Sequence, residues 1–130
     1  MPDAPSVEDA TVPLLASTPA VALRDSIGVN VHLSYTDTAY ADFPTLKSKL
    51  QALGVRHVRD GACAGCTEQQ DRLRSLGEAG IGLNLIMGRP RSHETVAQNV
   101  AMVESRLAEH VVSLEGANEY DLSGDAEWAA

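Results

Sequence analysis

Basic residues are scarce in this sequence, and long apolar runs are absent from it. Ten Lys and Arg stand against 18 Asp and Glu, and the resulting net charge of -8 repels phosphate backbones and anionic membrane surfaces. No segment approaches the roughly 20 apolar residues that a membrane-spanning helix needs. We therefore expect a soluble chain that binds neither nucleic acid nor membrane.

The start of the sequence also lacks the features of a secretory signal, since residues 1–20 have neither a basic beginning nor a continuous apolar core. Four prolines occur there among small and acidic residues, a composition that cannot sustain a helix or a central strand. We predict a flexible lead-in over residues 1–20 and a folded domain over residues 21–130.

Cysteine is limited to Cys63 and Cys66, which lie between a predicted strand and the start of a predicted helix. A thioredoxin-like redox motif would occupy this place, but the order of the other elements does not match that fold. A disulfide-clipped loop or two free thiols are the favoured alternatives. Zinc needs about four ligands, and only His57 and Asp60 lie near enough in sequence to join the pair. We expect neither a metal nor a cofactor.

The rest of the sequence alternates short apolar runs with amphipathic stretches, as strands and helices do in α/β proteins. The runs start 28, 26 and 30 residues apart, and they cover residues 27–33, 55–59, 81–87 and 111–117. Each run is followed by a helix rather than a tight hairpin. We therefore predict parallel strands joined by right-handed crossovers.

Three helices are predicted between these runs. The first has Asp42 as its N-cap, Pro44 in its first turn and Gly54 after its end. The second begins with a capping box at residues 67–70 and ends at Gly80, and the third begins near Ser92. Each helix is predicted to bury one apolar stripe. The first helix buries Leu46, Leu50 and Leu53, and the second buries Leu73 and Leu76. The third buries Val96, Val100, Val103 and Leu107.

A four-stranded parallel sheet is either an open doubly wound sheet or an arc of a closed barrel. Nucleotide-binding folds place a glycine-rich turn after the first strand, whereas residues 32–38 contain no glycine. We predict an α/β fold that is the N-terminal half of a (β/α)8 TIM barrel, with four parallel strands and three helices. Residues 125–130 are interpreted as the start of a fourth helix, cut before it can pack.

In such a barrel the active site forms at the carboxyl ends of the strands. The polar residues predicted there are His32, Arg59, Asp60, the Gly88-Arg89 turn and residues 118–121.

Several of these residues allow two interpretations. Arg59 forms either a surface ion pair with Asp60 or Glu119, or holds a catalytic carboxylate in its ionised form. His32 either binds a sugar hydroxyl or is a capped histidine of the barrel. Glu119 is either a solvated loop carboxylate or a site residue, and Glu115 is its rival because strand alternation places both on one face.

Three segments together resemble the large clan of retaining glycoside hydrolases that includes cellulase-like and β-xylosidase-like families. They are Ser-Ile-Gly-Val-Asn-Val-His at residues 26–32, Leu-Gly-Val-Arg-His-Val-Arg-Asp at 53–60 and Glu-Gly-Ala-Asn-Glu at 115–119. The resemblance extends from about residue 26 to residue 128. Many members of the clan have proline after the glutamate, where this chain has Tyr120.

The resemblance implies a catalytic acid/base at Glu119 and a substrate-binding set of Asn118, His32, Arg59 and Tyr120. In the clan the asparagine bonds the sugar 2-hydroxyl, and an arginine on strand two supports the nucleophile. The implied activity is retaining hydrolysis of O-glycosidic bonds in a β-linked oligosaccharide or polysaccharide. The nucleophile would come from strand seven, so we expect residues 1–130 alone to be inactive.

Two other functions are kept as alternatives. The first is a non-catalytic half-barrel that binds carbohydrate or associates with a second copy through its open sheet edges. The second is a thiol oxidoreductase that uses Cys63 and Cys66. The resemblance would imply a secreted protein, although the sequence leaves the compartment open.

Overall fold

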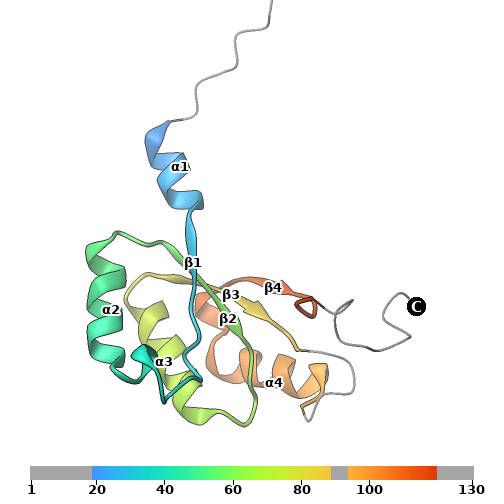
Figure 1. Ribbon diagram of the computed structural model, residues 1–130. Helices are drawn as coiled ribbons and strands as arrows, with labels where there is room; N and C mark the ends of the chain where they lie inside the picture. The colour runs from blue at the N-terminus through green and yellow to red at the C-terminus, as the bar shows by residue number, and fades with distance from the viewer. Residues whose placement is uncertain (1–18, 89–93, 120–130) are drawn as a thin grey trace, which may run out of the picture.

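The computed structural model describes residues 19–88 and 94–119, which form an α/β fold with one parallel sheet (Figure 1). The strands are β1 (Gly28–Asn30), β2 (His57–Gly61), β3 (Gly82–Ile86) and β4 (Val111–Glu115), in the order β1-β2-β3-β4. The helices are α1 (Ala20–Ser26), α2 (Phe43–Ala52), α3 (Thr67–Glu78) and α4 (Val96–Arg106), with short 3-10 turns at Ala39–Ala41 and Ala108–His110. The predicted α/β class and parallel strands are confirmed.

The strands alternate between two faces of the sheet. On β2, Val58 and Asp60 are buried, and they point to the same side as Leu83 and Leu85 of β3. This helix-covered face packs against α2, α3 and α4, because these helices supply the rest of the core. The core residues from the helices and their ends are Leu50, Leu73, Leu76, Met102, Val103 and Leu107.

The opposite face of the sheet, which we call the open face, carries the alternate residues. Strand register places Asn30, Arg59, Asn84 and Ser113 in one row across it. The next row toward the carboxyl ends contains Gly61, Ile86 and Glu115. In the part of the chain that the structure describes, the sheet is open, with β1 and β4 as its edges. Closure into a barrel stays a prediction.

The predicted starts and ends of the helices are confirmed in part. Asp42 caps α2 by accepting a hydrogen bond from the Thr45 amide at 3.2 Å, and Gly54 and Gly80 follow α2 and α3 with φ of 68° and 82°. Positive φ is the conformation that ends many helices and favours glycine. Residue 92, the predicted start of the third helix, lies outside the described residues, and Thr95 caps α4 with a capping box to Gln98.

Three details of the helix predictions are wrong. The N-cap of α3 is Cys66 without a side-chain hydrogen bond, so residues 67–70 do not form a capping box. Leu53 is 76% exposed because α2 ends at Ala52, and Val96 is 44% exposed because it begins α4 at the outer end of the stripe. Asn99 and Met102 are buried in α4 instead.

Helix α1 was not predicted, and it begins at Ala20, the last residue of the predicted lead-in. None of its residues is buried, and Figure 1 shows it projecting from the end of β1 away from the other helices. The predicted fourth helix at residues 125–130 lies outside the described residues. No helix in the described ranges combines the length and apolar character needed to cross a membrane.

Candidate functional site

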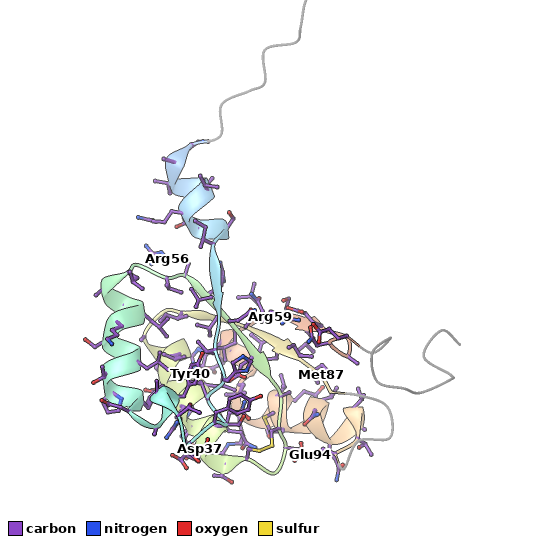
Figure 2. The ribbon with its side chains drawn as sticks, in the orientation of Figure 1. Asp37, Tyr40, Arg56, Arg59, Met87 and Glu94 are labelled. Atoms are coloured by element: carbon purple, nitrogen blue, oxygen red, sulfur yellow. A yellow bond between two sulfur atoms is a disulfide. The ribbon has the colours of Figure 1, made fainter. Side chains whose placement is uncertain are left out.

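Parallel strands bring their carboxyl ends to one edge of the sheet, and the candidate residues lie at this edge. His32 follows β1, Arg59 and Asp60 lie in the second half of β2, and Asn118 and Glu119 follow β4. Figure 2 shows Arg59 on the sheet beside β3 and β4. The predicted placement of these residues at one edge of a parallel sheet therefore holds.

Arg59 links β2 to the end of β4 across the open face. Its Nε donates to Glu115 Oε2 at 2.8 Å, and a terminal guanidinium nitrogen donates to Asn118 Oδ1 at 3.0 Å. The Arg59 and Glu115 side chains are 30% and 35% exposed, so solvent partly screens the pair. The arginine thereby fixes both a carboxylate and an amide of the fourth strand and its loop.

The proposed ion-pair partners of Arg59 were wrong. Asp60 points to the helix-covered face, because neighbouring residues of a strand point in opposite directions. Glu119 forms no hydrogen bond or ion pair with any residue of the described ranges. Glu115, considered only as a rival carboxylate, is the partner.

Asp60 is a buried carboxyl that joins the ends of β1 and β2. Its Oδ2 accepts from the Leu33 amide at 3.0 Å, and its Oδ1 accepts from the Gly61 amide at 2.8 Å. Burial raises the pKa of Asp60 above its usual value, while these bonds, Gln69 and the nearby His32 oppose the rise. Asp60 therefore shapes the edge of the site from behind the sheet.

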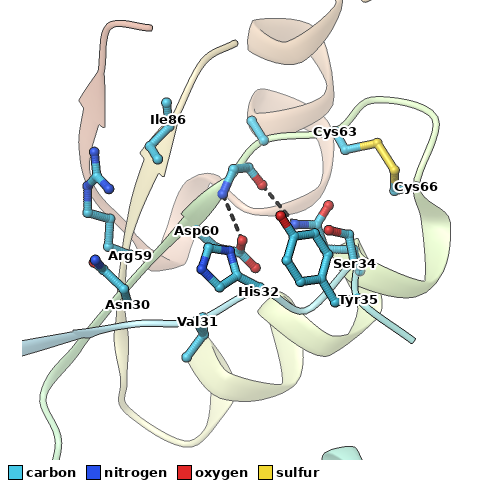
Figure 3. Close-up of a pocket in the computed structure, with 13 residues that line it drawn as sticks. Asn30, Val31, His32, Ser34, Tyr35, Arg59, Asp60, Cys63, Cys66 and Ile86 are labelled. Carbon is cyan, nitrogen blue, oxygen red and sulfur yellow. Dashed lines mark hydrogen bonds between the residues drawn. A yellow bond between two sulfur atoms is a disulfide. The ribbon is translucent and has the colours of Figure 1, made fainter. Parts of the chain in front are cut away.

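A cavity of about 300 Å³ lies between the loop after β1 and the end of β2 (Figure 3). His32, Tyr35, Arg59 and Asp60 line it together with the cysteine pair. The His32 ring stacks on Tyr35 with centroids 4.9 Å apart, and it meets the edge of Tyr40 at 5.9 Å. Two of the predicted substrate-binding residues, His32 and Arg59, thus line one cavity. Asn118 does not line it, but it is hydrogen-bonded to Arg59, which does.

Asn118 and Glu119 form an exposed turn after β4. Glu119 has φ of 47°, in the left-handed region that non-glycine residues seldom adopt. Such strain clusters at functional sites. Glu119 does not line the cavity, so the structure brings together Asn118, Arg59 and Glu115 but leaves Glu119 in solvent. Tyr120 and Arg89 lie outside the described residues.

Two residues of the site have no counterpart in the sequence predictions. Tyr35 stacks on His32, and Asn30 lines the cavity from the open face. An aromatic residue three positions after a strand-end histidine was a signal that could have found Tyr35. Asn30 could have been found by alternation, since it lies two positions before His32.

Cys63 and Cys66 form a disulfide, with Cα atoms 5.3 Å apart. Neither of the two residues considered as further zinc ligands joins them. His57 directs Nε2 to the Asp25 carbonyl oxygen at 2.8 Å, and Asp60 is engaged with backbone amides.

The fold and the site define the chain as an α/β domain with a four-stranded parallel sheet and a polar cluster at the carboxyl ends of its strands. No family model matches the chain, and neither a curated protein nor a solved structure matches it. The resemblance to glycoside hydrolases therefore rests on the residues quoted above, and it enters below as a proposal.

Proposed function

We propose that this chain supplies the acid/base half of a retaining glycoside hydrolase site on a (β/α)8 barrel. The observation that carries the proposal is the bridge from Arg59 on β2 to Glu115 and Asn118 at the end of β4. It supports the proposal because the resemblance assigns roles to an arginine of strand two and an asparagine of strand four. These two residues are 59 positions apart in the sequence and hydrogen-bonded in the fold.

The polarity of the open face argues against a doubly wound sheet. A doubly wound sheet has helices on both faces, so both faces of its strands are apolar. Here the open face carries Asn30, Arg59, Asn84, Ser113 and Glu115, and the strand order does not reverse within the described residues.

The exposure of β4 points the same way. Leu114 pairs with Leu85 on the helix-covered face, yet Leu114 is 49% exposed while Leu85 is fully buried. A further helix and strand beside β4 would cover Leu114, as in a complete barrel.

The proposed mechanism uses Glu119 as the acid that protonates the leaving glycosidic oxygen and then as the base that activates water. Asn118 would accept or donate a hydrogen bond at the sugar 2-hydroxyl, held in place by Arg59. The stacked His32 and Tyr35 rings would contact the sugar in the cavity, because aromatic faces pack well on apolar sugar faces. A second carboxylate about 5 to 5.5 Å from Glu119 is needed for retention.

The binding part of the proposal is tested by NMR titration of the ¹⁵N-labelled chain with cellobiose and xylobiose, two β-linked disaccharides. We expect shifts at His32, Arg59 and Asn118, and weaker binding of both sugars by Asn118→Ala. Ser105→Ala, on α4 away from the open face, is the matched control and should bind as the wild type does. Shifts that are absent, or unchanged in Asn118→Ala, would refute the proposed site.

The catalytic part has its own test. Residues 1–130 lack an assigned nucleophile, so the chain alone should not hydrolyse aryl β-glycosides. The opposite result would be hydrolysis by the chain alone that disappears in Glu119→Gln. It would show that the second carboxylate is already present in residues 1–130, and the assignment of the nucleophile to a seventh strand would be wrong.

A non-catalytic self-associating module is the second candidate, favoured by the exposed apolar residues of β4. Val112 and Leu114 are 60% and 49% exposed on an edge strand, and uncovered edges promote pairing between chains. Measuring the mass in solution separates the two candidates, because a clean monomer counts against a half-barrel that completes itself.

A further inference from the structure

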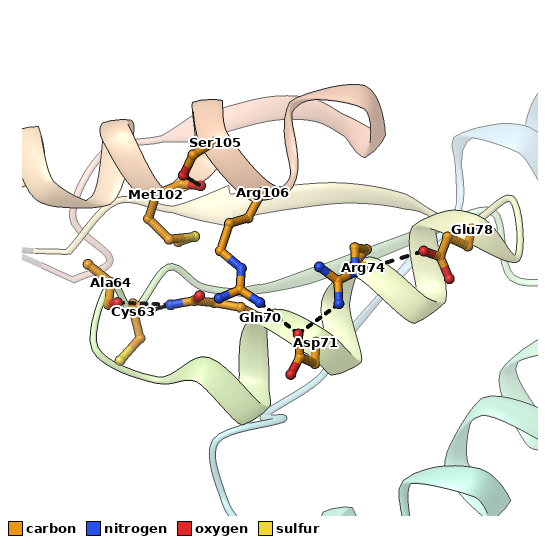
Figure 4. Close-up of polar contacts among 9 residues, drawn as sticks. All are labelled: Cys63, Ala64, Gln70, Asp71, Arg74, Glu78, Met102, Ser105 and Arg106. Carbon is orange, nitrogen blue, oxygen red and sulfur yellow. Dashed lines mark hydrogen bonds and ion pairs between the residues drawn. The ribbon is translucent and has the colours of Figure 1, made fainter.

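The loop between β2 and α3 carries both cysteines and is held by buried polar side chains. Gln70 of α3 donates from Nε2 to the carbonyl oxygens of Cys63 at 2.8 Å and Ala64 at 2.9 Å (Figure 4). Asn99 of α4 accepts from the Ala64 amide at 2.9 Å. Gln70 and Asn99 are both buried, so a shift of the loop would leave buried amides without partners, which is costly. The loop is therefore preorganised from two helices.

Glu94, which precedes α4, places a carboxylate against the sulfur of this loop. Its Oε2 accepts from the Ala64 amide and its Oε1 from the Gly65 amide, both at 2.7 Å. Oε1 also lies 3.4 Å from Cys63 Sγ. A Cβ at position 65 would lie 2.8 Å from Oε1, so glycine is needed for this approach. The two amides fix the orientation of the carboxylate.

We propose that Cys63, Cys66 and Glu94 bind one zinc-like divalent cation when the disulfide is reduced, so that disulfide and metal are alternative states of one site. One ligand atom from each of the three residues lies within 4.8 Å of the others. The three residues come from two different loops, so their meeting is a product of the fold and not of sequence proximity.

The distances suit tetrahedral coordination. Bonds of about 2.3 Å to sulfur and 2.0 Å to oxygen separate the ligand atoms of a tetrahedral zinc by roughly 3.5 to 3.8 Å. Cys63 Sγ and Glu94 Oε1 are already 3.4 Å apart. Only the two sulfurs must separate after reduction, and the Cys-x-x-Cys spacing is the usual one for two zinc thiolates. Both cysteines line the cavity, and water from it would be the fourth ligand.

The charges of the three side chains suit a divalent cation. Two thiolates and a carboxylate carry three negative charges, which a divalent cation neutralises in large part. The amide bonds to Glu94 then act as outer contacts that orient a metal ligand.

The two states interconvert by a balanced two-electron reaction. A phosphine or dithiol reductant gives two electrons to the Cys63–Cys66 bond, the sulfurs take up two protons, and the reductant is oxidised. Cation binding releases both thiol protons. An oxidant that removes two electrons restores the sulfur–sulfur bond and expels the cation.

The test uses Co²⁺ as a spectroscopic probe. The chain is reduced with a water-soluble phosphine, freed of it without air, and titrated with Co²⁺ and then with Zn²⁺. We expect one Co²⁺ per reduced chain, with thiolate-to-cobalt charge-transfer absorption and tetrahedral ligand-field bands, and displacement by Zn²⁺. The oxidised chain should show none of these bands.

Variants locate the site. Cys63→Ser should abolish the charge-transfer absorption. Glu94→Gln removes a direct ligand, so it should weaken Zn²⁺ binding by more than the roughly tenfold to hundredfold that loss of an outer-shell contact costs. Glu104→Gln, an exposed carboxylate change on α4, is the matched control and should bind as the wild type does. If reduction unfolds the chain, Co²⁺ should restore both the circular dichroism of the helices and the charge-transfer absorption.

Three results would overturn the proposal. They are a reduced chain without thiolate-to-cobalt absorption, a Glu94→Gln variant with unchanged Zn²⁺ affinity, and equal binding by the oxidised chain.

Discussion

On β2, Val58 lies fully buried beneath the helices, while its neighbour Arg59 points to the other side of the sheet and reaches β4. The same contrast holds on β3, where Leu83 and Leu85 are buried and Asn84 lies on the open face. One face thus holds the core, and the other holds hydrogen-bonding side chains. On β2 and β3, residues of the core and residues of the open face are separated by a single position along the strand.

The largest expected difference between the two faces is in stability. Leu85→Ala removes a fully buried side chain from the central part of the sheet and should lower the free energy of unfolding by about 3 kcal/mol. Leu114→Ala is the matched change on the exposed edge strand, and it should cost about 1 kcal/mol or less because half of the side chain is already exposed. Urea unfolding measures both. Equal losses would show that β4 is as well covered as β3.

Asp60 should make the stability of the chain depend on pH from the helix-covered face. Its pKa is raised in the folded chain, so its stabilising contribution is complete below the unfolded value of 3.8 and is lost as the pH rises through the folded value. Asp60→Asn cannot ionise. The stability advantage of the wild type over Asp60→Asn should therefore shrink as the pH rises from about 3 to 7. The check is a urea series across this range.

An advantage of the wild type that stays constant or grows with pH would mean that the hydrogen bonds to Asp60 outweigh its burial. Asp42→Asn is a useful comparison, because hydrogen bonding to Thr45 lowers the pKa of Asp42. Its contribution has the opposite sign: it is present above the unfolded value and lost as the pH falls through the folded value.

The smallest expected change in stability comes from Arg59→Met on the open face. The side chains of Arg59 and Glu115 are about one-third exposed, and such pairs contribute about 0.2 to 1 kcal/mol. Binding of β-linked disaccharide should nevertheless be lost, because Asn118 loses the group that orients it. Urea unfolding measures the change in stability, and NMR titration of the same preparation measures the loss of sugar binding. A large loss of stability with intact sugar binding would assign Arg59 to the fold.

Periodicity in the sequence predicted the repeated units but not where each one ends. The stripe of α4 was correct at Val103 and Leu107 and wrong at Val96, because an amphipathic pattern does not show where a helix extends past the sheet that it covers. The Thr67 capping box failed because Gln70 bonds the cysteine loop instead of the helix start.

The partners of the site residues depend on the register in which neighbouring strands pair. This register cannot be predicted from the sequence pattern. An irregularity between Leu83 and Asn84 shifts the pairing of β4, so that Val111 pairs with Leu83 and Ser113 with Asn84. This shift places Glu115, the carboxylate of β4, on the open face with Arg59. Glu94 was missed for a related reason, since it lies 31 residues from Cys63 in the sequence and meets it through two separate loops.

The most direct test of a carbohydrate site on the open face is the dissociation constant of the wild-type chain for cellobiose against that for its α-linked counterpart, maltose, measured by calorimetric titration. If Arg59, Glu115 and Asn118 form a site for β-linked glycans, we expect cellobiose to bind more tightly than maltose. We expect Asn118→Ala to lose this preference. Equal affinities, or no binding of either disaccharide, would contradict it.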